Sequence, residues 1–110
     1  MRIWLVGADT KGTQALRQLA KNQRVDVIVS DISDRPRAVT EGLIDHVDYV
    51  EQVSSLNINH IARRIQPDLI LIDASALDRN WGHVTGGSAL SEAMTQEMAS
   101  VSEYPCLILD

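Results

Sequence analysis

The sequence predicts an α/β fold in which an open, doubly wound parallel sheet of about five strands is covered by helices on both faces, giving three αβα layers. Apolar runs of strand length alternate with segments of helical periodicity along all 110 residues. The apolar side chains are nearly all aliphatic, because the chain has no Phe and only 4% aromatic residues. Continuous aliphatic runs are typical of parallel strands buried on both faces.

Five apolar runs are the expected strands, at residues 3–6, 25–29, 47–50, 69–72 and 106–109. Four segments are the expected helices, at residues 15–20, 36–42, 58–65 and 90–101. Pro36 suits a first helical turn, Gly42 can close that helix, and Pro67 stops the next one. Leu90, Met94 and Val101 fit the spacing of the last helix, with Ser88 as its N-cap.

Composition and charge exclude several classes of function. The length fits one domain over residues 1–110, which either stands alone or belongs to a longer chain. The net charge of -5 and the scattered basic residues argue against nucleic acid as a partner. No apolar run is long enough to cross a membrane. The single Cys106 cannot form an internal disulfide and is expected to pack as a small apolar residue, which favours a reducing, cytoplasmic setting. The three histidines lack the spacing of metal ligands, so no metal site is expected.

The first candidate site is the turn after the first expected strand, Gly7-Ala8-Asp9-Thr10-Lys11-Gly12. A glycine turn leading into a helix is the setting in which backbone N–H groups bind a phosphate. Against the dinucleotide fingerprint G-x-G-x-x-G, Gly7 and Gly12 hold the first and third glycine positions. Asp9 replaces the second, where a carboxylate adds bulk and repels a pyrophosphate. The alternative is that the glycines serve only the geometry of a strand-to-helix turn.

The second candidate is Asp31, which ends the second expected strand. A carboxylate at that position can accept both ribose hydroxyl hydrogens of an adenosine. Arg35 or Arg37 can instead meet a ribose phosphate, so the choice between NAD and NADP stays open. The alternative is that Asp31 and Asp34 are turn formers and helix caps.

The third candidate is the stretch of residues 73–88, expected to be a long loop at the ligand edge of the sheet. Asp73 and Ala74 begin it, where ligands of such sheets bind. Gly86, Gly87 and Ser88 form a second candidate anion cradle at the start of the last helix. His83 has no carboxylate or nucleophile at a suitable spacing, so a catalytic role for it is not favoured.

Residues 2–7, Gly12, the helix that follows and residues 27–35 together resemble the N-terminal half of the TrkA-N, or RCK, domains. The likeness covers about the first 35 residues. It implies a Rossmann domain that regulates potassium channels and transporters by binding NAD(H), ATP or ADP. It also implies that Gly7 and Gly12 shape the phosphate turn and that Asp31 holds the adenine ribose. The implied partners are a membrane-transport protein or a second copy of the chain.

Two other resemblances compete with this one. Residues 45–51, 57–65 and 66–72 look like the lobe that precedes ATP-grasp domains. Residues 67–73 and 104–109 resemble two strands of response-regulator receivers, which makes Asp73 a candidate phospho-acceptor and Asp9 a candidate acidic-pocket residue.

The first hypothesis is therefore a regulatory domain that binds an adenine nucleotide without turning it over, so an enzyme is not favoured. A receiver-like signalling module is the second. A third is an interaction or assembly domain whose glycine turn holds no ligand, in which Asp9 would fill the place of a pyrophosphate.

Overall fold

The computed structural model describes residues 1–81 and 87–110, and these contain a sheet of five parallel strands in the order β3-β2-β1-β4-β5. The strands are β1 (Arg2–Val6), β2 (Asp26–Asp31), β3 (Tyr49–Val50), β4 (Leu69–Asp73) and β5 (Cys106–Leu109). The predicted doubly wound sheet is confirmed. The strand order reverses between β1 and β4, the position at which ligands bind in sheets of this kind.

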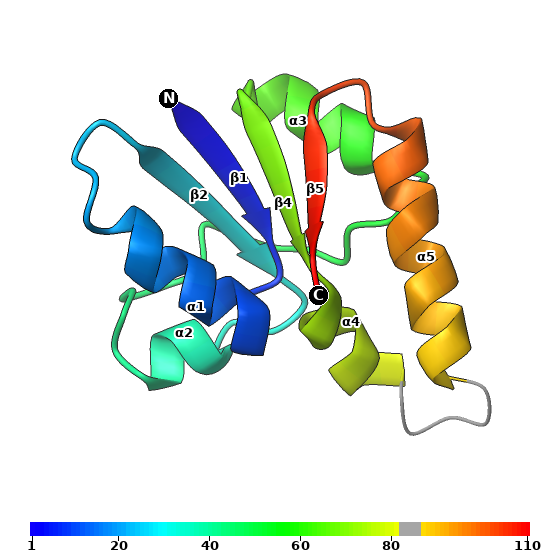
Figure 1. The fold of residues 1–110 in the computed structure, drawn as a ribbon, viewed down its shortest axis with the longest axis horizontal. Coiled ribbons are helices and arrows are strands. Elements are labelled where there is room, and N and C mark those ends of the chain that lie inside the picture. The colour runs from blue at the N-terminus through cyan, green and yellow to red at the C-terminus, as the bar shows by residue number, and fades with distance from the viewer. Residues whose placement is uncertain (82–86) are drawn as a thin grey trace.

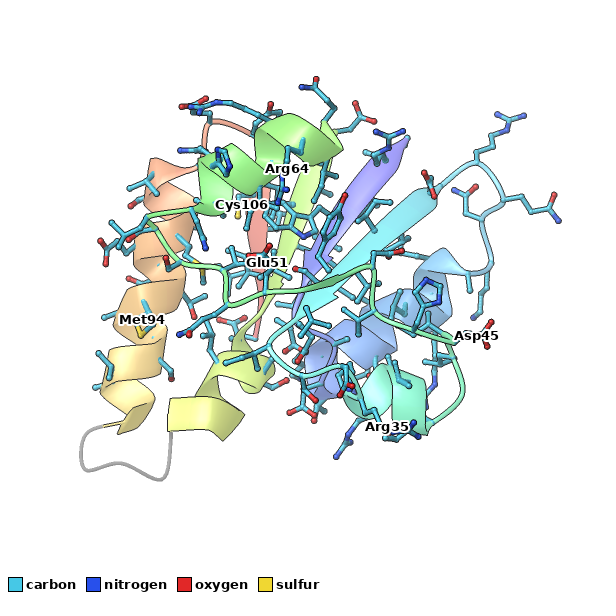
Figure 2. All side chains as sticks on the ribbon, turned by 180° about the vertical axis from the view of Figure 1, so that it is seen from behind. Arg35, Asp45, Glu51, Arg64, Met94 and Cys106 are labelled. Atoms are coloured by element: carbon cyan, nitrogen blue, oxygen red, sulfur yellow. The ribbon has the colours of Figure 1, made fainter. Side chains whose placement is uncertain are left out.

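Helices cover both faces of the sheet (Figure 1). They are α1 (Thr10–Leu19), α2 (Arg37–Thr40), α3 (Ile58–Ile65), α4 (Ala74–Trp81) and α5 (Gly87–Val101). Helices α1 and α2 lie on one face and α3 and α5 on the other, while α4 extends from the end of β4. Figure 2 shows the segment between α2 and α3, which carries Glu51, running across the molecule from the α2 side to the α3 side. All strands point toward the edge at which α1 and α4 begin, and this is called the carboxyl edge below.

Alternate side chains of the strands build two separate apolar cores, as expected for strands covered on both faces. On the α1 side, Ile3 and Leu5 of β1 pack with Leu16 of α1. On the α3 side, Trp4 of β1 packs with Ile61 of α3. The aliphatic composition thus serves a sheet in which successive residues of one strand enter opposite cores.

Two predicted helix ends are confirmed by backbone geometry. Gln66 follows α3 in the left-handed conformation, with φ of 58°, and Pro67 comes directly after it. Gly42 lies two residues after α2 with φ of 78°, a conformation that glycine adopts without strain. Among the described residues, no helix is both long enough and apolar enough to span a membrane.

Two predictions about the second half of the chain are wrong. Residues 74–81 form α4 rather than a loop. Helix α5 begins at Gly87, so Ser88 lies inside it and is not its N-cap. The predicted last helix is present; it buries Met98 and the polar side chains of Ser91 and Thr95, while Leu90 and Val101 are exposed. Thr95 can be buried because its hydroxyl donates to the Ser91 carbonyl at 2.7 Å, which satisfies its hydrogen.

Strand β3 is shorter than expected, because only Tyr49 and Val50 pair with β2. Val47 enters the core on the α1 side, and the Asp48 carboxylate accepts the Val29 amide at 2.8 Å. Cys106 is confirmed as a packed strand residue, and burial raises the pKa of its thiol to about 11.

A hydrogen bond inside the α3-side core gives a first prediction. The fully buried Trp4 indole N–H donates to the fully buried Ser30 hydroxyl at 2.9 Å. The Ser30→Ala variant leaves this donor without an acceptor, so we expect the free energy of unfolding in urea to fall by about 1–3 kcal/mol. The matched control is Ser100→Ala on the exposed side of α5. We expect it to change the free energy of unfolding by less than about 0.5 kcal/mol. Equal losses in the two variants would contradict this account.

Candidate functional site

The switch in strand order brings three segments together at the carboxyl edge. The glycine turn follows β1, Asp31 ends β2, and Asp73 ends β4. Because β1 is the middle strand of these three, both carboxylates reach its turn from either side. The glycine turn, Asp31 and Asp73 therefore lie together at this edge.

The two glycines of the turn are required by close packing. Gly7 has φ of 92°, and a Cβ atom there would lie 2.8 Å from the Ala76 Cβ and 3.1 Å from the Asp73 Cβ. A Cβ atom on Gly12 would lie 2.4 Å from the Gly7 carbonyl oxygen. Gly7 therefore admits the first turn of α4, and Gly12 admits α1 against the end of β1. This geometry explains both glycines without a ligand. It agrees with the alternative interpretation, in which the glycines serve only the geometry of a strand-to-helix turn.

The Asp73 carboxylate caps two helices at once. Its Oδ2 accepts the backbone amides of Asp9, at 2.9 Å, and Gly12, at 2.7 Å, at the start of α1. Its Oδ1 accepts the Ser75 amide at 2.9 Å and the Ser75 hydroxyl, at the start of α4. A carboxylate offers about four lone-pair positions, so these four donors use all of them. With 1% of its surface exposed, Asp73 is a buried helix cap whose acceptor positions are all used.

Asp31 has a similar position but spare acceptor capacity. Its Oδ2 accepts the Ala8 amide at 2.8 Å, and its Oδ1 accepts the Ser33 amide at 2.9 Å. Among the described residues these are its only side-chain hydrogen bonds, so each oxygen keeps about one lone pair for a further donor. The side chain is 7% exposed and borders a cavity.

That cavity lies between the ends of β1, β2 and β4 and has a volume of about 40 Å³. Its apolar wall is formed by Val6, Ile32, Val53, Ala76, Leu77 and Met98. It has room for about three water molecules. The exposed side chains of Ile32 and Gln52 form its outer rim, so outward movement of these two would enlarge it.

The Asp9 carboxylate has its Oδ1 3.6 Å from the Arg37 guanidinium, on the α2 side of the turn. Arg37 also pairs with Glu41 at 3.7 Å. The carboxylate at the turn amides belongs to Asp73 instead, which the sequence does not place there. Arg35 borders a cleft of about 580 Å³ beside Asp9, and Figure 2 shows it at the outside of the molecule.

The remaining candidates have smaller contacts with the site. Ala8 is fully buried in the α1-side core. The Lys11 amide donates to the Ser75 hydroxyl at 3.2 Å, and Thr10 is partly buried at the first position of α1. Ala74 starts α4 and lines a second cleft together with Lys11. His83 and Gly86 lie outside the described residues.

Ser75 is a site residue that the sequence interpretation missed. It donates to Asp73 and accepts from Lys11, so it joins the starts of α1 and α4. The signal was an Asp followed two residues later by a Ser directly after a strand, a pattern typical of helix N-caps.

The strand order argues against a receiver. Receivers have the order 2-1-3-4-5, in which the third strand lies next to the first. Here β3 pairs with β2 at the outer edge. Asp73 has no lone pair left for a nucleophilic attack and almost no exposed surface, so the structure does not support it as a phospho-acceptor.

No protein-family model matches the chain, and no curated protein matches it. Among solved structures, it is similar to the crystal structure of UDP-glucose 4-epimerase with UDP-glucose from the hyperthermophilic eubacterium Thermotoga maritima. The TM-score is 0.54, the identity is 15%, and the match covers 98% of this chain and 37% of that one. The chain thus spans little more than a third of the length of that enzyme. The likeness shows the fold, a Rossmann-like domain.

The Gly12 contact gives a second prediction. In an ordinary helix, replacing glycine by alanine adds about 1 kcal/mol of stability. Because the new Cβ of Gly12→Ala would lie 2.4 Å from the Gly7 carbonyl oxygen, we expect a loss of about 1–3 kcal/mol in urea unfolding instead. The matched control is Gln14→Ala, at an exposed position of the same helix, with a change below about 0.5 kcal/mol. An unchanged or raised stability of Gly12→Ala would refute the close contact.

Proposed function

We propose that the domain binds an adenine nucleotide, NAD(H), ATP or ADP, at the carboxyl edge of its sheet and does not convert it. The observation that carries this proposal is Asp31. Its carboxylate is held by two backbone amides, keeps about one lone pair on each oxygen, and lies at the end of β2, beside the turn of β1 at which the strand order switches. Two ribose hydroxyls are the donors that such a pair of acceptors fits.

The cavity beside Asp31 supports the placement of the base. Its wall is mainly aliphatic, as a planar heterocyclic ring requires. At about 40 Å³ it is too small for the ring as it stands, so binding includes outward movement of Ile32 and Gln52. Side-chain changes of this kind are common when a ligand binds.

The fold comparison supports a nucleotide as the class of ligand. The similar Thermotoga maritima structure contains UDP-glucose, a nucleotide sugar. Asp31 and Asp73 both accept hydrogen bonds from backbone amides, and the proposal gives them binding and structural roles without turnover. The proposed role is that of a regulatory binding domain. Its TrkA-N resemblance points to a potassium-transport protein or a second copy of the chain as partner, and the ATP-grasp lead-in lobe stays an alternative prediction.

The test is a binding series. Wild-type protein is screened by thermal shift with NAD, NADH, NADP, ATP, ADP and AMP at millimolar concentration, because a ligand well above its Kd raises the melting temperature. The ligand with the largest shift is then titrated calorimetrically into Asp31→Asn, which keeps the size of the side chain. Loss of charge-assisted hydrogen bonds to the ribose is expected to raise the Kd about tenfold or more.

The matched control is Asp48→Asn, which changes a carboxylate that accepts the Val29 amide and does not line the cavity beside Asp31. Its Kd is expected to equal that of the wild type. The proposal fails if no compound stabilises the wild type, or if Asp31→Asn and Asp48→Asn bind equally well.

A further inference from the structure

The backbone amides that a phosphate would need are already bonded within the protein. In the turn, Ala8 donates to Asp31, Lys11 donates to Ser75, and both Asp9 and Gly12 donate to Asp73. Among the described residues, the Thr10 amide is the one N–H of this stretch for which no acceptor is present. A phosphate approaching the turn would find a single donor instead of a cradle.

Asp73 cannot easily leave this position. Its backbone is fixed in β4, between β1 and β5, and its second oxygen is bound by the amide and hydroxyl of Ser75. The Cβ atom of Asp73 fits closely against Gly7. Turning the carboxylate away would leave the Asp9, Gly12 and Ser75 amides without acceptors in a buried place, which is unfavourable.

Charge adds to this exclusion. The Asp73 carboxylate lies at the N-termini of α1 and α4, where the partial positive charge of each helix favours an anion. A ligand phosphate would compete for the same positive ends and would be repelled by the carboxylate. Asp9, buried on the same turn, is paired with Arg37 at 3.6 Å, so the exclusion is attributed to Asp73.

Asp31 differs from Asp73 in this respect. Both are buried carboxylates at strand ends, but Asp31 has about two lone pairs unused and borders a cavity, whereas Asp73 has none unused. The carboxyl edge thus offers acceptors for neutral hydroxyl groups at Asp31. The position in the glycine turn where a phosphate would otherwise bind is closed by Asp73.

We infer that the Asp73 carboxylate takes the place of a ligand phosphate in the glycine turn, so that the ligand is recognised through its adenosine half and its phosphates add no affinity there. This inference rests on the proposed function for the identity of the ligand, but the role of Asp73 is testable without it.

The first experiment compares adenosine, AMP, ADP and NAD by calorimetry on the wild type at constant ionic strength. Their Kd values are expected to agree within about threefold, a difference below about 1 kcal/mol. ADP or NAD binding tenfold or more tightly than adenosine would overturn the inference while leaving the proposed function intact.

The second experiment opens the turn. Asp73→Ala removes the internal anion. Inorganic phosphate or pyrophosphate is therefore expected to raise the melting temperature of this variant at roughly 10–20 mM, a concentration suited to a weak anion site. The same salts should not raise that of the wild type beyond a potassium chloride control of equal ionic strength. The matched variant is Asp68→Ala, which removes a carboxylate that accepts the Arg2 amide at the opposite edge of the sheet, and phosphate should not stabilise it. Equal phosphate effects on the wild type, Asp73→Ala and Asp68→Ala would overturn the inference.

Asp73→Ser covers the case in which the alanine variant does not fold. Its uncharged hydroxyl can still cap the start of α4 but is too short to replace the carboxylate at the Asp9 and Gly12 amides. The ratio of adenosine Kd to ADP Kd is expected to rise at least tenfold over the wild type, and an unchanged ratio would contradict the inference. If adenosine binds neither protein but phosphate stabilises Asp73→Ala alone, the proposed function fails and the role of Asp73 stands.

Discussion

One carboxylate, that of Asp73, caps two helices at the carboxyl edge, and the local structure of this edge depends on it. Its four hydrogen bonds join the end of β4 to the starts of α1 and α4. The contact requires a glycine turn, because a Cβ atom on Gly7 or Gly12 would push α4 or α1 away. The negative charge is also stabilised by the N-termini of both helices. The glycines and the acid are therefore one structural unit.

This unit changes what the glycine turn can bind. In a nucleotide-binding Rossmann turn, free amides face the pyrophosphate. Here the amides of Asp9 and Gly12 face an internal anion, and of the two strand-end carboxylates Asp31 and Asp73, Asp31 is the one with unused acceptor positions. We propose that the chain combines this fold with a closed phosphate position, and that ligand recognition depends on the Asp31 oxygens and the aliphatic cavity beside them.

Local sequence patterns predicted most of the fold, because aliphatic runs and helical spacing act over a few residues. The strand positions, the stop at Pro67 and the closing Gly42 followed from such patterns. These patterns do not predict helix α4, since they place its N-cap, Asp73, in a loop. The pairing of Asp73 with the glycine turn joins residues 61 and 64 positions apart, and no local pattern reveals it. Among the candidate site residues, Asp31 lies where expected, but only the tertiary contacts show that it and Asp73 differ in acceptor capacity.

Hydrogen exchange of the turn amides in the ligand-free protein tests this account most directly. The Asp9 and Gly12 amides are bonded to Asp73, whereas the described residues provide no acceptor for the neighbouring Thr10 amide, which serves as an internal reference. The account predicts that Asp9 and Gly12 exchange at least about tenfold more slowly than Thr10 after correction for intrinsic rates. Exchange of all three amides at the same fast rate would show that the Asp73 carboxylate does not occupy the turn.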